Sequence, residues 1–374
     1  MSNRKLKVCI FTAARSEYGL FQWIISDMER DPHIDLSLIV GGGHLSPEQG
    51  MTVRQIESDG HEIAARVEFL LSTATDTGVA KSAAMCAMSM ADVLDRIRPD
   101  VLLVLGDRYE LMAVCSTALM MNIPIAHISG GDITEGAIDN QIRNAVTMMS
   151  DLHFPCTEES CQRVLAMTGG CTPAYNVGEP GLETFARHKP MSRQELAVSL
   201  GIDPAKRWVL CTLHTETKKP LAYSMELAIS TMEAMTAIPD AEIIVTAANA
   251  DAGGSELNAY YRAFCDSHPG FRFIHSLGHS RYLSMMWQAY AMIGNTSSGI
   301  LEAPFTGVPV VNIGNRQKGR HLCDNIITPA GVTRNDIASA IARIPDRHLE
   351  PDLYFGDGEC SAKIIKHLKE RYLK

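Results

Sequence analysis

The stretch VLLVLGDRYE, residues 101–110, decides the fold class of this chain. Five consecutive apolar residues, 101–105, predict a short strand buried on both faces, as strands of parallel sheets are. Asp107 and Arg108 follow after one glycine, where the carboxyl end of such a strand meets the next loop. Ligands of open parallel sheets bind beyond the carboxyl ends of the strands. The stretch therefore predicts an α/β protein with its functional groups at one edge of the sheet.

The same alternation of short apolar runs and longer helical patterns extends in both directions and predicts two doubly wound halves with a cleft between them. In the first half we expect further strands at 7–12, 35–40, 123–128, 153–156 and 174–177, and helices at 18–30, 51–59, 78–97, 111–121, 138–149 and 158–167. After residue 178, Gly and Pro interrupt the pattern, and a second series follows. Its strands are expected at 208–213, 242–246, 271–275, 291–293 and 309–313, and its helices at 223–237, 255–267, 281–288, 299–306 and 334–344. We place the domains at 1–180 and 181–360, with a final helix at 361–374.

Composition excludes several classes of protein. Net charge is −9 for 374 residues, which argues against a nucleic-acid binder because counterion release needs clustered Lys and Arg. No apolar run approaches the ~20 residues that a membrane span needs. The 10 cysteines are scattered without a C-x-x-C pair, and no H-E-x-x-H spacing occurs, so we expect free core thiols and no metal site. These features favour a cytoplasmic protein.

Polar residues follow the first two expected strands. Arg15 lies where the first strand meets a helix, and a helix N-terminus favours an anion. The alternative is a solvated turn with Ser16 as the helix cap. His44 follows three glycines after the second strand, where it is either a ligand contact or a surface residue.

The densest polar cluster of the first half is HISGGDITEGAID, residues 127–139. It contains Asp132, Glu135 and Asp139, and Asp139 shares a helix face with Arg143, four residues later. An exposed, capped loop is the alternative interpretation. For Asp107 and Arg108 the alternative is a local pair that caps the next helix, and we favour a functional role there.

In the second half, His214 ends the first strand and is as often structural as functional in such a place. The sequence GNTSSGILE, residues 294–302, offers backbone N–H groups and hydroxyls, as a diphosphate cradle does. The candidate ligands there are Asn295, Ser297, Ser298, Gly299 and Glu302, with Arg316 from the following GNRQKGR segment. Glu302 suits the hydroxyls of a ribose, or else complements the helix dipole.

Together these motifs, with ARSEYG (14–19) and HLSPEQG (44–50), resemble the hydrolysing UDP-N-acetylglucosamine 2-epimerases of sialic acid precursor synthesis. The resemblance implies a GT-B architecture of two Rossmann-like domains, with the last helix packing back on the first domain. It implies that Arg15 contacts phosphate, that the 297–302 segment binds UDP, and that Asp107, Asp139 and His214 are catalytic. It implies no cofactor, neither NAD nor metal.

The implied reaction has two steps. A base removes the C2 proton while the C1–O bond to UDP breaks, which gives 2-acetamidoglucal, and water then adds to give the free C2 epimer. On this basis we class the chain as a UDP-sugar hydrolase/2-epimerase of the glycosyl-bond hydrolysing type. In the family that the chain resembles, a Glu or another functional side chain often stands where this chain has Ser129. Asp132 or Glu135 is therefore expected to serve as the base, with Asp132 favoured.

Several alternatives stay open. The expected substrate is UDP-GlcNAc, which would give ManNAc and UDP, and the alternative is UDP-2,4-diacetamido-2,4,6-trideoxyglucose of the legionaminic acid pathway. Two alternative activities are a non-hydrolysing 2-epimerase and another GT-B glycosyltransferase. The non-enzymatic alternative is a regulator that only binds a nucleotide-sugar. The resemblance suggests a homodimer or homotetramer. The helix with Met85, Met88 and Met90 is an interface or, as we favour, ordinary core.

Overall fold

The computed structural model describes residues 4–73, 75–133, 138–216, 218–249 and 251–373. Glu135, one of the expected catalytic residues, lies outside these ranges. The chain divides into two compact units, of which unit 1 is Met1–Ala186 with Gly356–Lys374 and unit 2 is Arg187–Phe355. The second unit therefore begins after, and ends before, the boundaries at 180 and 360 that the sequence suggested.

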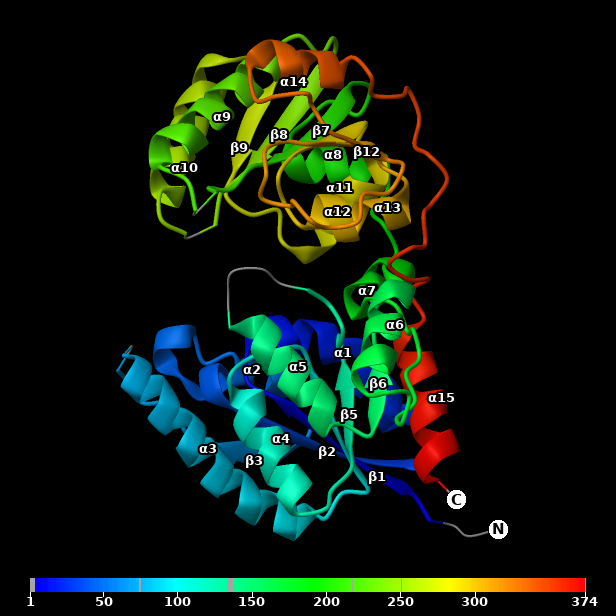
Figure 1. Cartoon of the computed structure of the whole chain (residues 1–374). Coiled ribbons are helices and arrows are strands. Elements are labelled where there is room, and N and C mark those ends of the chain that lie inside the picture. The colour runs from blue at the N-terminus through cyan, green and yellow to red at the C-terminus, as the bar shows by residue number, and fades with distance from the viewer. Residues whose placement is uncertain (1–3, 74, 134–137, 217, 250, 374) are drawn as a thin grey trace. The chain divides into compact units, whose positions relative to one another are not determined.

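Within the described residues, unit 1 is built on a six-stranded parallel sheet in the order β3-β2-β1-β4-β5-β6 (Figure 1). The strands are β1 (Leu6–Thr12), β2 (Ile34–Gly41), β3 (Ile63–Val67), β4 (Val101–Leu105), β5 (Ile125–Ile128) and β6 (Leu152–Phe154). The helices are α1 (Arg15–Arg30), α2 (Val53–Ser58), α3 (Asp76–Ile97), α4 (Glu110–Met120), α5 (Asp139–Met149), α6 (Glu158–Met167), α7 (Pro180–Arg187) and α15 (Cys360–Tyr372), with 3-10 helices η1 (Gly42–Leu45) and η2 (Pro47–Gln49).

Both faces of this sheet are covered, because successive residues of a strand point to opposite sides. On β1, Val8 and Ile10 pack into a core shared with α1, α2 and α15. Cys9 and Phe11 pack into a second core shared with α3, α4 and α5. The apolar runs of the central strands are explained by this double burial.

Unit 2 repeats the plan with a six-stranded parallel sheet in the order β12-β11-β10-β7-β8-β9, again within the described residues. The strands are β7 (Arg207–Thr212), β8 (Ala241–Thr246), β9 (Phe271–Ile274), β10 (Ala291–Gly294), β11 (Val310–Asn312) and β12 (Ile326–Ile327). The helices are α8 (Arg193–Leu200), α9 (Leu221–Met235), α10 (Gly254–Ser267), α11 (His279–Gln288), α12 (Ser298–Leu301), α13 (Ala303–Thr306) and α14 (Arg334–Ile341). Helices α9, α10 and α14 share one core with the sheet.

Each sheet has the strand order 3-2-1-4-5-6 of a Rossmann domain when its strands are counted from its own first strand. The order reverses direction between β1 and β4 in unit 1 and between β7 and β10 in unit 2. Loops at the carboxyl ends of these strand pairs diverge, which leaves room for a ligand. A ligand is therefore expected at the two reversal points. The strand orders confirm the expected α/β class.

The structure differs from the sequence expectations mainly at sheet edges and junctions. Apolar patterns do not reveal the edge strands β3 and β12, since β3 alternates buried and exposed residues and β12 is two residues long. The stretch 174–177 forms a single bridge, between His153 and Ala174, instead of a strand. The expected helix 299–306 is two short helices, α12 and α13, because Pro304 cannot donate the backbone hydrogen bond that a continuous helix needs.

The junction after residue 178 is helical where we expected only interruptions. Helix α7 begins at Pro180, a residue that suits the first turn of a helix, and buries Leu182 and Phe185. Among the described residues no helix is long and apolar enough to cross a membrane. Nine of the cysteines are buried free thiols as expected, and Cys171 is exposed.

Candidate functional site

At the reversal point of unit 1, charged side chains from the loops after β1 and β4 face one another. Arg108 donates from Nη2 to Glu110 Oε1 at 2.7 Å, and Glu110 is fully buried at the start of α4. Glu17 in the first turn of α1 interacts with both of them electrostatically. Arg15, the first residue of α1, is exposed. The expected cations Arg15 and Arg108 thus lie at the loops where a ligand of this fold binds.

Glu17 is a site residue that the sequence analysis missed. Its Oε2 accepts hydrogen bonds from the N–H groups of Ala13 and Ala14, at 2.8 and 3.0 Å, so Glu17 and not Ser16 caps the helix. Burial raises the pKa of Glu17 to about 7, against the lowering effect of these bonds and of Arg108. A capping acid three residues into a helix is the signal that would have indicated it.

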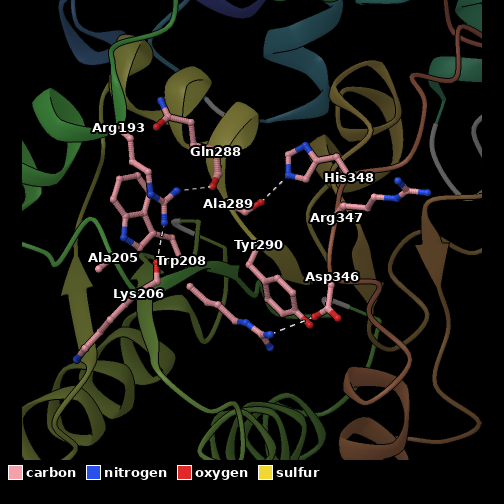
Figure 2. Close-up of a pocket in the computed structure, with 11 residues that line it drawn as sticks. Arg193, Ala205, Lys206, Trp208, Gln288, Ala289, Tyr290, Asp346, Arg347 and His348 are labelled. Carbon is pink, nitrogen blue, oxygen red and sulfur yellow. Dashed lines mark hydrogen bonds and ion pairs between the residues drawn. The ribbon is translucent and has the colours of Figure 1, made fainter.

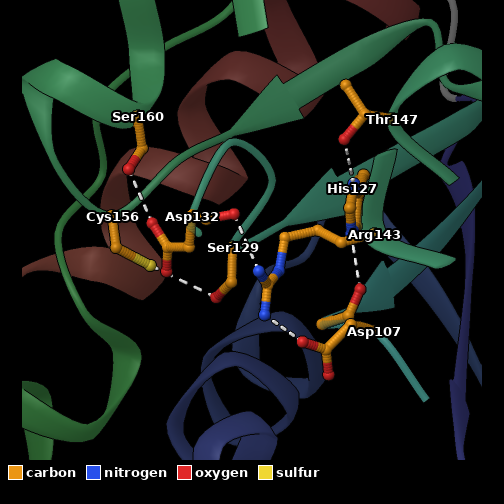
Figure 3. A network of polar contacts seen from close by, with 9 residues as sticks. Asp107, His127, Ser129, Asp132, Arg143, Thr147, Cys156 and Ser160 are labelled. Carbon is orange, nitrogen blue, oxygen red and sulfur yellow. Dashed lines mark hydrogen bonds and ion pairs between the residues drawn. The ribbon is translucent and has the colours of Figure 1, made fainter. Parts of the chain in front are cut away.

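Arg143 joins two of the expected carboxylate positions (Figure 3). It extends from α5, is buried, and forms a salt bridge from Nη2 to Asp107 Oδ2. Its Nη1 donates to the backbone carbonyl of Asp132 at 2.7 Å. Arg143 thereby holds together the loops that follow β4 and β5, and the expectation that it contacts the substrate or UDP stays a prediction.

Asp107 lies among like charges at this point. Burial raises its pKa first of all, and Asp139 and Asp132 raise it further, while Arg143 lowers it. Asp139 is the first residue of α5 and half-buried. Three of the expected catalytic carboxylates therefore interact in one region of unit 1, which is a common arrangement for proton transfer.

The side chain of Asp132 is hydrogen-bonded as well as its backbone. Ser160, in the first turn of α6, donates from its hydroxyl to Asp132 Oδ1 at 2.6 Å. The preceding Gly131 has φ +84°, and a Cβ there would lie 2.3 Å from the carbonyl oxygen of Ser160. Only glycine lets the loop pass this close to α6.

Two histidines of unit 1 are structural. His127 is fully buried, with its ring nitrogens 2.8 Å from the Gly106 carbonyl oxygen and 3.2 Å from the Thr147 hydroxyl. His44 is also fully buried, and its ring nitrogens contact the hydroxyls of Thr12 and Thr52. Burial lowers the pKa of His44 to about 4. His44 is therefore not the surface residue of the alternative interpretation, and both of its ring nitrogens have partners inside the fold. A substrate contact by His44 stays a prediction.

In unit 2 the two loops at the reversal point are bonded to each other. Asn295, after β10, accepts the His214 N–H on Oδ1 at 2.7 Å and donates from Nδ2 to the His214 carbonyl at 2.9 Å. Gly294 allows this approach, since φ is +149° and a Cβ would lie 2.0 Å from the Thr212 carbonyl oxygen. The Asn295 side chain thus fixes the backbone of His214, and its expected contact with UDP stays a prediction.

The His214 ring is a neutral hydrogen-bond donor. Its Nδ1 accepts the Asn249 N–H at 3.1 Å, which leaves the ring hydrogen on Nε2. Burial and the nearby Arg316 lower the pKa of His214 to about 4. At neutral pH the ring therefore carries no charge and can offer one N–H to a ligand oxygen.

The segment expected to cradle a diphosphate begins directly after this point. Ser297 and Ser298 are half-buried, and Gly299 is buried against Val310. The Ser298 hydroxyl is hydrogen-bonded to Glu302, whose pKa is raised by burial. Tyr282 from α11 also contacts Ser298 and is a neighbour of Glu302.

Arg316 completes the group of expected residues in unit 2. Its Nη1 lies 3.4 Å from the Asn295 carbonyl oxygen, to which Gln317 donates at 2.8 Å. The loop that carries Arg316 is anchored where Glu216 Oε1 accepts the Asn315 N–H at 2.6 Å. Glu216, Gln317 and Tyr282 were not expected from the sequence.

A cavity of about 280 Å³ in unit 2 lies at the opposite ends of the strands, beside the first residue of β7 and just before β10 (Figure 2). Its Arg193 donates to three backbone carbonyls and stacks on Trp208. Arg207 pairs with Asp346, and His348 Nε2 donates to the Ala289 carbonyl. These side chains join α8 and the 346–348 segment to the sheet, so we assign this cavity a structural role. Within the described residues, no group of three or more His, Cys, Asp or Glu side chains is arranged to hold a metal ion.

Two Rossmann-type units, one with clustered carboxylates and one with a hydroxyl-rich loop, define a GT-B-like α/β protein. The solved structure of UDP-GlcNAc 2-epimerase from Neisseria meningitidis bound to UDP-GlcNAc superimposes with a TM-score of 0.77 at 16% identity, covering 98% of this chain and 100% of that one. The sequence pattern of the family described as UDP-N-acetylglucosamine 2-epimerase matches residues 26–369. The chain belongs to this family.

Two curated relatives are similar over most of both chains. The GDP/UDP-N,N'-diacetylbacillosamine 2-epimerase (hydrolyzing) of Campylobacter jejuni is 33% identical, over 92% of this chain and 89% of that protein. The UDP-N,N'-diacetylbacillosamine 2-epimerase (hydrolyzing) of Legionella pneumophila is 30% identical, over 97% and 95%. Both are named as 2-epimerases, which overturns our classification of the chain as a glycosyl-bond hydrolase.

Proposed function

We propose that this protein is a hydrolysing 2-epimerase of UDP-2,4-diacetamido-2,4,6-trideoxyglucose, the sugar nucleotide also called UDP-N,N'-diacetylbacillosamine. The names of the Campylobacter and Legionella relatives support this substrate. The observation that carries the reaction type is the arrangement in which Arg143 bonds both Asp107 and the backbone of Asp132. It gathers carboxyl groups that can remove and return a proton at one carbon.

In the proposed reaction, Asp132 removes the proton from C2 and the electron pair forms the C1=C2 double bond. The C1–O bond breaks, and UDP leaves with that bond's electron pair. Water then adds its hydroxyl to C1, and a carboxylic acid returns a proton to the opposite face of C2. The proton that the water loses restores that acid, and Asp132 releases the proton taken from C2 to solvent. Asp107, whose pKa burial raises, is suited to hold that proton, with Asp139 as its neighbour.

We assign UDP binding to unit 2. The neutral His214 offers its Nε2–H, and Arg316 a positive charge, to the departing diphosphate, whose negative charge grows as the C1–O bond breaks. Ser297, Ser298 and the Gly299 backbone are assigned to the diphosphate, and Glu302 to the ribose. Arg15 and Arg108 are the remaining proposed cations.

The test is a proton NMR assay in D₂O with the UDP-linked and the GDP-linked diacetamido sugar, because the Campylobacter relative is named for both nucleotides. We expect free UDP and a free manno-configured sugar with deuterium at C2. Asp132→Asn is expected to lower kcat by ~10²-fold or more. Asp95→Asn, a change of an exposed carboxylate on α3, should leave kcat unaltered. Exchange at C2 with UDP still attached would reject hydrolysis in favour of a non-hydrolysing epimerase.

UDP-GlcNAc is the second candidate substrate and was the first choice from the sequence. The Neisseria meningitidis structure, which holds UDP-GlcNAc, supports including it. The same assay decides between the two, since the preferred substrate will have the higher kcat/KM. A product from UDP-GlcNAc alone would place the enzyme in sialic acid rather than legionaminic acid precursor synthesis.

We also propose a homo-oligomer, either a dimer or a tetramer. Met88 on α3 is 75% exposed and Met120 on α4 is 81% exposed, whereas Met90 is fully buried in the core. Large apolar side chains with such high exposure are candidates for a contact site between subunits. Light scattering should give a multiple of 40.9 kDa for the wild type and a smaller mass for Met88→Lys/Met120→Lys. An unchanged mass would exclude this surface as the interface.

A further inference from the structure

The hydroxyl of Ser160 is the middle member of a directed chain of hydrogen bonds that runs from Thr157 to Asp132, and Figure 3 shows its contact with Asp132. Thr157, the N-cap of α6, accepts the Ser160 N–H on its Oγ1 at 3.1 Å and donates its own hydroxyl hydrogen to Ser160 Oγ at 2.9 Å. Ser160 then has one hydrogen left to donate, and it points to Asp132 Oδ1 at 2.6 Å. The direction of the whole chain is thereby fixed.

This chain makes the two oxygens of Asp132 inequivalent. Oδ1 accepts a hydrogen bond from a hydroxyl that cannot turn away, because Ser160 is 2% exposed and its own oxygen is occupied by Thr157. A proton placed on Oδ1 would face the Ser160 hydrogen and break the chain. A proton taken up by Asp132 therefore belongs on Oδ2.

The backbone around Asp132 is fixed as firmly as its side chain. Gly131 is packed against the Ser160 carbonyl oxygen in a conformation that favours glycine. Arg163 Nη1 donates to the Gly131 carbonyl at 2.9 Å, and Arg143 Nη1 donates to the Asp132 carbonyl at 2.7 Å. Backbone and carboxylate are thus both oriented by groups outside the loop.

We infer that Ser160 is a positioning residue, which presents Oδ2 of Asp132 as the oxygen that exchanges a proton with the sugar. The inference rests on the proposed role of Asp132 as the base. A carboxylate that is already oriented with one oxygen toward the substrate loses less conformational entropy when the proton is transferred.

The test compares Ser160→Ala, Ser160→Cys and Thr168→Ala in the full-length protein. Thr168 is a matched control, since its hydroxyl lies at the other end of α6 and donates to the Val164 carbonyl. With the preferred sugar nucleotide, Ser160→Ala should lower kcat by ~10-fold or more and leave KM within about twofold. Ser160→Cys keeps a weak donor of similar size and should recover part of kcat.

A purely structural role for Ser160 predicts a different pattern. Ser160→Ala and Thr168→Ala would then lower the melting temperature and kcat in parallel, and that result would overturn the inference. An unchanged kcat in Ser160→Ala, or no recovery in Ser160→Cys, would overturn it as well. Melting temperatures of all variants are measured beside the rates.

A wild-type protein that converts none of the sugar nucleotides would refute the proposed function instead. The positioning is then decided by crystal structures of the wild type and Ser160→Ala at the same pH. A rotated Asp132 carboxylate in the variant supports positioning by Ser160, and an unchanged carboxylate contradicts it.

Discussion

Burial raises the pKa of two carboxyl groups in unit 1, Glu17 and Asp107. Glu17 is 6% exposed and accepts two backbone hydrogen bonds, yet burial still raises its pKa to about 7. Asp107 is raised as well, although Arg143 forms a salt bridge with it. Desolvation thus outweighs hydrogen bonding and attraction at both carboxyls. The edge of the sheet where a ligand is expected therefore contains acids that titrate above their ordinary range.

Glu17 makes stability depend on pH. Because its pKa is higher in the folded protein than the value of about 4.5 in the unfolded chain, the folded state binds this proton more tightly. The free energy of unfolding therefore falls as pH rises from about 4.5 to about 7, by at most about 3 kcal/mol from this group. Glu17→Gln keeps an acceptor for the two N–H groups and removes the titration. Urea unfolding should show that this variant gains stability relative to wild type between pH 5 and pH 8, unlike the exposed control Glu48→Gln. Equal differences at both pH values would contradict the assignment.

Gly131 is the glycine with the clearest consequence. Gly131→Ala adds a Cβ that would lie 2.3 Å from a backbone oxygen, at a φ of +84°. We expect it to cost about 2 kcal/mol or more in stability and to displace Asp132, so kcat falls too. Gly169→Ala is the matched control, because its φ is +62° but nothing lies within 4 Å of the new Cβ. Similar melting temperatures for the two variants would contradict this prediction, because they would mean that the loop and α6 move apart with little loss of stability.

At the scale of elements, one helix belongs to a unit far from it in sequence. Helix α15 buries Ile364 and Leu368 in the core that contains α1. Its second residue, Ser361, donates its N–H to Glu183 Oε2 at 2.8 Å, and its hydroxyl contacts Glu183 and Asp27. Residues from α1, α7 and α15 thus meet at one buried point.

Ser361→Ala removes the hydroxyl from this point and leaves Glu183, which is 1% exposed, with one fewer partner. Loss of a hydrogen bond to a buried charge typically costs about 1.5–3 kcal/mol, and we expect a loss of stability in that range. Ser339→Ala, at an exposed hydroxyl on α14, should cost less than about 0.5 kcal/mol. Thermal unfolding of both variants measures the difference. A cost for Ser361→Ala as small as that of the control would mean that α15 is held by its apolar face alone.

At the scale of the whole molecule, the two units differ in continuity. Unit 2 is the single segment Arg187–Phe355 with its own core, whereas unit 1 needs both ends of the chain. Truncation at the C-terminus therefore removes part of unit 1 and none of unit 2. The two units also divide the proposed tasks, with carboxylates in unit 1 and the UDP-binding residues in unit 2.

Residues 187–355 expressed alone should therefore fold cooperatively and bind UDP. We expect Glu302→Gln in this fragment to weaken UDP binding by ~10-fold, because a buried acceptor for ribose hydroxyls becomes a weaker one. Glu256→Gln, an exposed change in the first turn of α10, should leave the affinity unchanged. Calorimetric titration with UDP provides the measurement. A folded fragment that does not bind UDP would remove unit 2 from the proposed division of tasks.

The sequence by itself determined the features that depend on near neighbours. Double burial of the central strands produces uninterrupted apolar runs such as 101–105, so their positions and the α/β class were readable. The motifs after those strands pointed to Asp107, Asp132 and Asp139 in the first sheet and to His214 in the second, because parallel strands bring their carboxyl ends to one edge of each sheet.

Only the tertiary structure decided what depends on distant partners. Asn295 and His214 are 81 residues apart, and their mutual hydrogen bonds give Asn295 a structural role that no local pattern indicates. Ser160 is 28 residues from Asp132, and no local pattern indicates that its hydroxyl points there. Edge strands such as β3 are half-exposed and lack a clear apolar run, so they too emerged only when the sheet was formed. A local sequence pattern records which face of an element is buried, and it cannot record which distant side chain covers that face.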